Sequence, residues 1–293
     1  MTITPSPRQI MTTLLPTLKT AARYAQQIQT RIESQPDKEH DNIFGAALSD
    51  ADLSVQTAIE VALLADFPTI RFYGEEFDLT DNTKYFRAIT LGEVGDYLVT
   101  LDPIDGTRFY LDGHDNFCVI LTVLDADEYA AAIALFPAKN QYYAAFRGEG
   151  AVQGTFADNL ADCQPFQLNP QANRVYVGRN APAVLAQFNA QYPDRYSLIC
   201  LATDYDANQP TPNHTSILSG ECCGSIIDTG KWIDAAAIAF LAQEAGGILT
   251  QWNGEPLAPL HTNDPSYDRG PLMIAANTSI HQDFLTVTRS LLT

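Results

Sequence analysis

Two carboxylates one turn apart near the middle of the chain could bind a hard metal ion. They are Asp102 and Asp105, within the sequence LDPIDGT at residues 101–107. Carboxylate and carbonyl oxygens are the ligands that hard divalent cations prefer. Gly106 lets the backbone approach a ligand closely, and Thr107 is suited to the start of a helix, whose free N–H groups attract anions. The motif therefore predicts a phosphate group held next to divalent metal ions.

The residues around this motif predict how it is positioned. An apolar run at 97–100 precedes it and is typical of a buried strand, and residues 107–111 continue as a short helix. Because Pro103 has a fixed φ and no N–H, we expect the chain to leave the sheet directly at this point. Asp-Pro and Asp-Gly are also common turn dipeptides. Several constrained positions after a strand, with further carboxylates upstream, favour the functional interpretation.

The motif DPIDGT at 102–107 resembles the signature of the inositol monophosphatase family, the metal-dependent, often lithium-sensitive phosphatases of sugars and inositols. Two further matches support this resemblance. The sequence GEE at 74–76 is similar to the first metal-ligand motif of the family. The sequences DAA at 234–236 and EAGG at 244–247 are similar to its C-terminal motif. The resemblance extends from about the first helix to the last strand.

The resemblance implies a set of metal ligands from three separate segments. Its members are Glu75, Asp102, the Ile104 carbonyl, Asp105 and Asp234. One ion would be held by Glu75, Asp102 and the Ile104 carbonyl, and a second by Asp102, Asp105 and Asp234. Because the set contains only oxygen ligands, Mg²⁺ is expected rather than zinc or copper, with two or three ions in all.

The same resemblance implies roles for other residues near the metals. Thr107, oriented by Asp52, would polarise the attacking water, and Glu76 would assist that water. The amides of Gly106 and Thr107 would hold the phosphate. For Asp52, an ordinary role in capping the helix that begins near residue 50 is an equal alternative from the sequence alone. An adjacent, exposed Glu76 could equally be a bystander.

The expected substrate-binding segment is shorter than in the family. After GSII at 224–227, the chain reaches Asp234 within a few residues, where the family has two strands and a substrate-binding Glu. Ser225 and Asp228 are the candidates for binding the substrate or its phosphate in this segment. Ile226 stands where a small residue is expected. Asp234 could also be an N-cap, a role that is compatible with metal binding.

These features predict Mg²⁺-dependent hydrolysis of a small phosphate monoester by metal-activated water, with inositol phosphate as the first substrate to test. The alternatives are fructose-1,6-bisphosphatase or 3′-phosphoadenosine-5′-phosphate phosphatase activity. A non-catalytic, metal-binding family member with a regulatory role is a further alternative, because the substrate segment is short.

Charge and composition limit the partners. The chain of 293 residues has 17 Lys and Arg against 35 Asp and Glu, a net charge of −18, which disfavours binding to nucleic acid polymers or to anionic membranes. Bound cations would still attract a phosphorylated metabolite. Five cysteines without regular spacing, and no signal peptide, predict reduced thiols in a cytoplasmic protein. The family resemblance implies a homodimer.

Alternating helical and strand patterns predict an α/β fold. We expect an N-terminal α+β part at 1–160 that carries the first two metal motifs and a C-terminal α/β part at 161–293 that carries Asp234. The resemblance refines this to alternating α-β-α-β-α layers. Pro16 is expected to kink or interrupt the first helix. Polar residues at 77–96 predict a surface loop or hairpin.

Overall fold

The computed structural model describes residues 4–36, 38, 43–76, 96–126, 128–178, 181–260 and 268–292. The loop predicted at 77–96 lies outside these residues except for Asp96. The chain forms two compact units. The first contains Met1–Arg147 and Val152–Gln164, and the second contains Gly148–Ala151 and Pro165–Thr293.

The first unit is built on a seven-stranded sheet whose strands follow one another in chain order. They are β1 (Arg71–Gly74), β2 (Leu98–Asp105), β3 (Cys118–Asp125), β4 (Glu128–Phe136), β5 (Gln141–Phe146), β6 (Gly150–Thr155) and β7 (Gln164–Phe166). β1 runs parallel to β2, whereas β2, β3, β4 and β5 pair antiparallel. Both β2 and β3 are buried along their whole length, which explains their continuous apolar runs.

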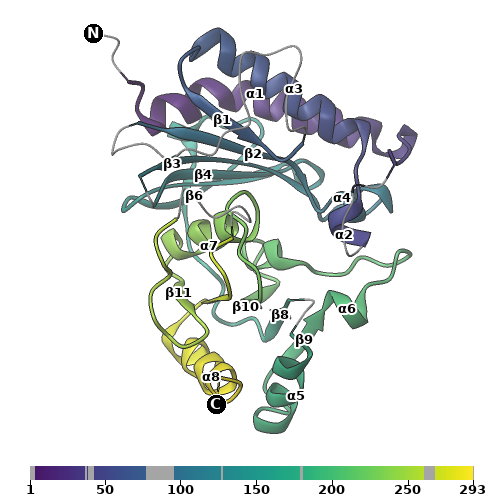
Figure 1. Cartoon of the computed structure of the whole chain (residues 1–293), viewed down its shortest axis with the longest axis vertical. Coiled ribbons are helices and arrows are strands. Elements are labelled where there is room, and N and C mark those ends of the chain that lie inside the picture. The colour runs from purple at the N-terminus through teal and green to yellow at the C-terminus, as the bar shows by residue number, and fades with distance from the viewer. Residues whose placement is uncertain are drawn as a thin grey trace. The chain divides into compact units, whose positions relative to one another are not determined.

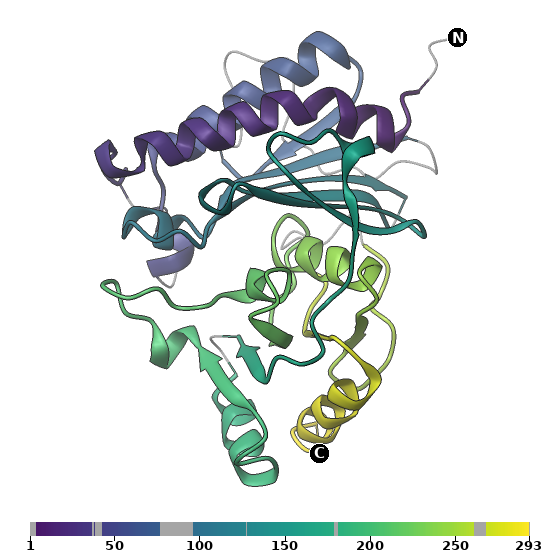
Figure 2. The same ribbon diagram turned by 180° about the vertical axis from the view of Figure 1, so that it is seen from behind.

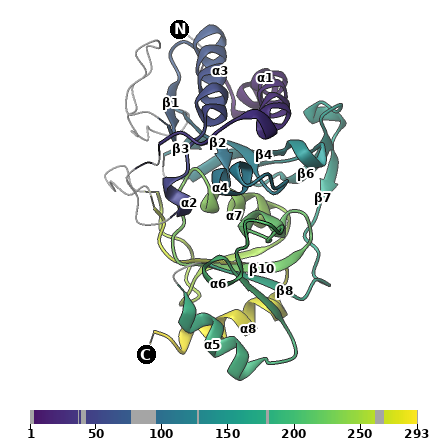
Figure 3. The ribbon, with the colours of Figure 1, turned by 90° about the vertical axis from the view of Figure 1, so that its right-hand side faces the viewer.

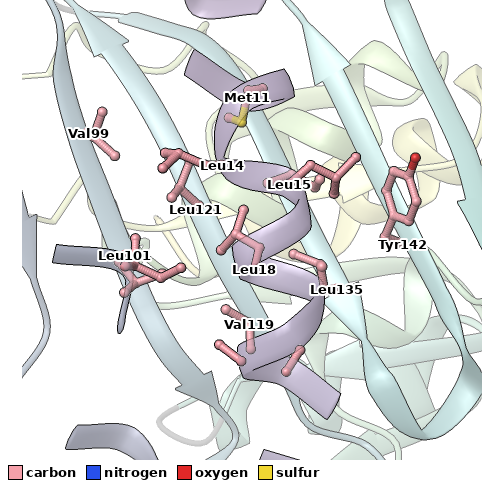
Figure 4. Close-up of a cluster of buried hydrophobic side chains, with 14 of the residues drawn as sticks. Met11, Leu14, Leu15, Leu18, Val99, Leu101, Val119, Leu121, Leu135 and Tyr142 are labelled. Atoms are coloured by element: carbon pink, nitrogen blue, oxygen red, sulfur yellow. The ribbon is translucent and has the colours of Figure 1, made fainter. Parts of the chain in front are cut away.

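Two long helices, α1 (Pro7–Ile28) and α3 (Asp50–Asp66), lie side by side along one face of this sheet (Figures 1, 2 and 3). Short helices α2 (Ile43–Ala46) and α4 (Thr107–Leu111) lie near the end of β2. Apolar side chains of α1 point toward the strands and form the core in Figure 4. The labelled residues are Met11, Leu14, Leu15, Leu18, Val99, Leu101, Val119, Leu121, Leu135 and Tyr142.

The prediction that Pro16 interrupts the first helix is wrong, because α1 continues through it. Pro16 lies on the exposed face of α1, where the carbonyl that loses its hydrogen bond faces water. The buried face stabilises the helix by packing on the sheet, and tertiary packing outweighs a single lost bond. A capping box of Ser6 and Gln9 fixes the start of the helix.

The prediction that the chain leaves the sheet at Pro103 is also wrong. β2 continues to Asp105, and its register against β3 shifts between the pairs Asp102↔Ile120 and Asp105↔Cys118. The shift places one extra residue in β2, as in a β-bulge. A bulge is one of the few positions where a strand accepts proline, because a residue there does not have to donate an N–H to the neighbouring strand.

The second unit contains a five-stranded sheet in the order β11-β12-β10-β8-β9. Its strands are β8 (Arg174–Val177), β9 (Ser197–Cys200), β10 (Cys222–Ile227), β11 (Ile248–Gln251) and β12 (Leu272–Ala275). Within this unit, α5 (Pro182–Gln191) and α8 (Thr278–Arg289) lie on one face of the sheet and α7 (Ala235–Glu244) lies on the other (Figure 1). Short helical turns complete the chain: η1 (Gln29–Arg31), η2 (Pro137–Lys139), η3 (Leu160–Asp162), α6 (Leu201–Asp204) and η4 (His214–Ile217).

The two sheets with their helices confirm the predicted α/β fold class. The five cysteines carry free thiols. Among the described residues, no helix is both long enough and apolar enough to cross a bilayer. The domain division at residue 160 stays a prediction.

Candidate metal and phosphate site

The parallel pairing of β1 and β2 brings two acidic segments together at the ends of these strands. Gly74 pairs with Leu101, and the Glu75 N–H donates a hydrogen bond to the Leu101 carbonyl at 3.0 Å. The chain at Glu75 therefore lies beside the chain at Asp102. Carboxyl ends of parallel strands are common places for functional side chains, because adjacent strands deliver residues to one edge.

The bulge of β2 holds two buried carboxylates. Asp102 is 4% exposed and Asp105 is 6% exposed, while the Ile104 side chain belongs to the core. Cys118 donates a weak hydrogen bond from its thiol to Asp105 at 3.5 Å. Burial raises the pKa of Asp105 to about 7, and the negative charge of Glu75 adds to this rise, while the Cys118 bond opposes it.

Gly106 and Thr107 form the turn that the sequence predicted. Gly106 has φ +89° and is the N-cap of α4, a conformation that favours glycine. Thr107 Oγ1 lies 2.9 Å from the Ile104 carbonyl and 3.1 Å from Asp52 Oδ1. The hydroxyl has one proton, so it donates to one of these two acceptors at a time.

Asp52 makes a contact of each kind that the two sequence alternatives require. It is the third residue of α3, whose N-cap is Ser49, and the two form a capping box. Its carboxylate accepts from the Ser49 N–H at 2.9 Å and also from Thr107. Burial raises the pKa of Asp52 to about 7, the Ser49 bonds oppose the rise, and the charges of Glu76 and Glu75 add to it.

Lys38 belongs to this site, although the sequence patterns did not single it out. Its Nζ lies 2.8 Å from Glu76 Oε1 and 3.2 Å from Glu75 Oε1. Burial disfavours the charged lysine, but the two carboxylates outweigh burial and raise its pKa. The sequence allowed Glu76 to be an exposed bystander. In the structure Glu76 is only 3% exposed and is paired with Lys38, so it is a buried carboxylate.

Two further polar residues of α3 were missed. Gln56 and Glu60 continue a buried stripe that starts at Asp52, each one helical turn after the last. The sequence does carry a signal for this stripe. Polar residues recur there every four positions, next to the apolar series that includes Val55 and Ile59. Gln56 contacts the backbone at Glu76.

The other three candidate residues lie in the second unit. Ser225 is buried in β10, and Asp228 follows that strand, with its carboxylate packed against Gly178. Asp234 is the N-cap of α7 and accepts a hydrogen bond from the Ala235 N–H. Residues 228–233 contain only a bend, an isolated bridge and a turn, so this segment before Asp234 holds no pair of strands.

The donor atoms of the first unit suit a hard cation. No three His, Cys, Asp or Glu side chains lie close enough to enclose a metal ion by themselves, within the part of the chain that the structure describes. Mg²⁺ does not need such a cage, because it binds one or two carboxylates and completes its shell with water and phosphate oxygens. The carboxylates of Glu75 and Asp105 repel each other, and a divalent cation would relieve this repulsion.

Comparisons with known proteins agree with this chemistry. The sequence pattern of the Inositol monophosphatase family matches residues 10–288. The chain is 26% identical over 258 residues to a putative Nus factor SuhB from Neisseria meningitidis serogroup B, covering 84% of this chain and 89% of the relative. It is 30% identical over 219 residues to a histidinol-phosphatase from Chlorobaculum parvum, covering 71% and 73%.

A solved structure of an IMPase/NADP phosphatase complexed with Mg²⁺ and phosphate has the same fold, with a TM-score of 0.62. It is 19% identical in sequence, and the match covers 92% of this chain and 91% of that one. The family pattern matches nearly the whole chain, including the strands and turns that carry the buried carboxylates described above. The protein therefore belongs to the inositol monophosphatase family.

Proposed function

We propose that this protein is a Mg²⁺-dependent phosphatase that hydrolyses a small phosphate monoester. One observation carries the proposal. The backbone at Glu75, just after β1, lies beside the backbone at Asp102 in β2, and Thr107, just after β2, is hydrogen-bonded to the buried Asp52. Membership of a family that includes a histidinol-phosphatase 30% identical to this chain supports the same reaction class.

The ligand set of this proposal is the one expected from the sequence. Glu75, Asp102 and the Ile104 carbonyl would hold one ion, and Asp105 and Asp234 would join Asp102 around a second. We propose two or three ions in all. The related phosphatase complexed with Mg²⁺ and phosphate supports this choice of metal. When bound, Mg²⁺ supplies positive charge for the phosphate dianion and makes water more acidic.

The side chains near the metals have separate tasks. Ionised Asp52 accepts a hydrogen bond from the Thr107 hydroxyl. The lone pairs of Thr107 Oγ1 are then free to accept a hydrogen bond from the attacking water and so orient it. Glu76, which follows the neighbouring strand β1, assists this water. The amides of Gly106 and Thr107 bind phosphate oxygens at the start of α4. Ser225 and Asp228 contribute to substrate binding.

The test is release of inorganic phosphate by the purified protein with and without Mg²⁺. The substrates are inositol 1-phosphate, fructose 1,6-bisphosphate, 3′-phosphoadenosine 5′-phosphate and histidinol phosphate, and LiCl is added to test the lithium inhibition typical of the family. We expect Mg²⁺-dependent, lithium-sensitive release from at least one. If folded protein that binds Mg²⁺ hydrolyses none of them, the proposal of a phosphatase for these small metabolites is wrong.

A second candidate is a non-catalytic family member that works through a partner. The short segment at 228–233 and the similarity to proteins named Nus factor SuhB favour it. Calorimetry separates the two, because a phosphatase should bind phosphate more tightly once Mg²⁺ is present. We further propose a homodimer, which light scattering would reveal as twice the mass of the chain.

A further inference from the structure

Helix α3 carries a polar stripe that its packing does not require. Asp52, Gln56 and Glu60 follow one another at spacings of four and are 0%, 2% and 2% exposed. The neighbouring series that includes Val55 and Ile59 already fills the core beneath the helix. Because a buried polar group costs free energy unless it is hydrogen-bonded, an apolar residue at position 56 would pack at lower cost. The contacts of Gln56 therefore indicate why a polar residue stands there.

Gln56 uses both ends of its side-chain amide on one backbone unit. Its Oε1 accepts from the Glu76 N–H at 2.8 Å, and its Nε2 donates to the Glu76 carbonyl. The same Nε2 lies 2.9 Å from Glu60 Oε1, which holds the amide in this orientation. These two hydrogen bonds satisfy the N–H and the carbonyl of one residue, as a neighbouring strand would. They therefore hold the backbone in place beyond the last residue of β1.

Gly74 shows how closely the amide packs against the end of β1. A Cβ at this position would lie 2.3 Å from Gln56 Oε1 and 2.7 Å from its Nε2. Gly74 is not in the left-handed region of φ. The glycine before Glu75 and Glu76 is therefore explained by the approach of Gln56 and not by a tight turn.

We propose that Gln56 is a positioning residue for the Glu75 carboxylate, an inference that rests on the proposed metal-dependent function. The backbone around Glu75 is held from two sides. Its own N–H donates to Leu101 of β2, and the next residue, Glu76, is held by Gln56. The Glu75 side chain is 30% exposed and its Oε1 lies 3.2 Å from Lys38 Nζ, so its direction depends on the backbone and on this ion pair more than on packing. Without Gln56, the backbone that carries Glu75 loses its support on one side, and the Glu75 carboxylate is placed less precisely.

The test compares Gln56→Met, which keeps the length of the side chain without its hydrogen bonds, with wild type. We expect Mg²⁺ affinity in calorimetry to fall roughly 10–100-fold, the usual effect of removing a residue that orients a ligand. The value of kcat at saturating Mg²⁺ should change less than threefold, because the ligands themselves remain. In metal-free protein, the Glu76 amide should exchange its hydrogen roughly tenfold faster, because its acceptor is gone.

Two variants control for a merely structural effect. Leu15→Ala removes buried packing of α1 on the same sheet, so it should lower the thermal midpoint and leave both Mg²⁺ affinity and the Glu76 exchange rate unchanged. Gln56→Glu keeps an acceptor for the Glu76 N–H and loses the donor. It should protect the Glu76 amide more than Gln56→Met does. If Gln56→Met does not fold, Gln56→Glu is compared with wild type, and unchanged Mg²⁺ affinity together with faster Glu76 exchange would overturn the positioning role.

The outcomes distinguish this inference from the proposed function. If Gln56→Met binds Mg²⁺ as tightly as wild type while Glu75→Gln binds it weakly, the positioning role is wrong and the metal site stands. If wild type itself binds no Mg²⁺, both proposals fail. A loss of affinity that Leu15→Ala reproduces to the same degree would also overturn the positioning role.

Discussion

At the scale of single residues, Asp102 is a buried carboxylate that the proposed metal site would use as a ligand. It is 4% exposed in a strand that is buried along its whole length. We predict that Asp102→Asn lowers kcat by roughly 1,000-fold or more, because a bound Mg²⁺ supplies several kcal/mol of transition-state stabilisation. The thermal midpoint measured in EDTA should stay the same or rise, because the change removes a buried charge. A variant that is inactive only because it unfolds would contradict this interpretation.

The hydroxyl of Thr107 gives a second prediction. Thr107→Val should lower kcat roughly 10–100-fold, because the bond that fixes the hydroxyl to Asp52 is lost, whereas Thr107→Ser should retain most activity. Phosphate release under saturating Mg²⁺ measures the effect. Thr122→Val is a matched control, because Thr122 is a buried threonine whose hydroxyl bonds only to Thr100 in the contacts described, at 2.5 Å. Equal losses from Thr107→Val and Thr122→Val would exclude a specific role.

The pKa of Asp52 predicts how stability depends on pH when no metal is present. Burial raises this pKa to about 7, whereas the carboxyl in the unfolded chain titrates near its ordinary value of about 3.9. Between these values the folded state binds a proton that the unfolded state does not, so stability falls as pH rises toward 7. We expect the free energy of unfolding in EDTA to fall by a few kcal/mol between about pH 5 and pH 8.

Denaturant titrations across this range measure the effect of Asp52. In Asp52→Asn the fall should be clearly smaller, since an amide does not titrate. The remaining slope would come from Asp105, whose pKa burial also raises to about 7. A wild-type stability that increases steadily over the same range would show that these carboxyls are ionised in the folded protein.

At the scale of elements, the junction of β2 and α4 depends on Gly106. Its φ of +89° is unfavourable for any residue with a Cβ, and that Cβ would lie 3.4 Å from the Asn116 carbonyl. We predict that Gly106→Ala lowers the free energy of unfolding by about 1–2 kcal/mol and also lowers kcat, since the turn aims Thr107. Gly113→Ala is the control, because Gly113 has φ +81° with open space around its Cα. It should lose similar stability but keep its kcat.

At the scale of the whole molecule, the net charge of −18 makes cations a general source of stability. A specific site should act far more strongly than this general effect. We predict that Mg²⁺ at 100 times its Kd raises the free energy of unfolding by about 2.7 kcal/mol, and that phosphate adds to this only when Mg²⁺ is present. Differential scanning calorimetry measures both shifts. NaCl at equal ionic strength is the control, and an equal response to both salts would contradict a specific site.

Much of the fold follows from periodicity in the sequence. The apolar residues of α1 and α3 recur at helical spacing, and the apolar runs of β3 and β4 are long enough to mark buried strands. Pro16 and Pro103 show where this reasoning fails. Local rules for proline consider only the neighbouring residues in the chain. In the folded protein, Pro16 lies on the exposed face of a helix and Pro103 lies in a β-bulge, and both positions tolerate proline.

The sequence by itself determined which chemistry is proposed, because the carboxylates of residues 102–105 and the turn at Gly106 lie within a few residues of one another and side chains of these types favour a hard cation. Only the tertiary structure decided which groups hold these residues in place. Thr107 meets Asp52 across 55 positions, and Glu76 meets Gln56 across 20, because α3 packs along the sheet beside β1 and β2. Such contacts depend on the register of strands and the rotation of a helix, and no local spacing encodes them.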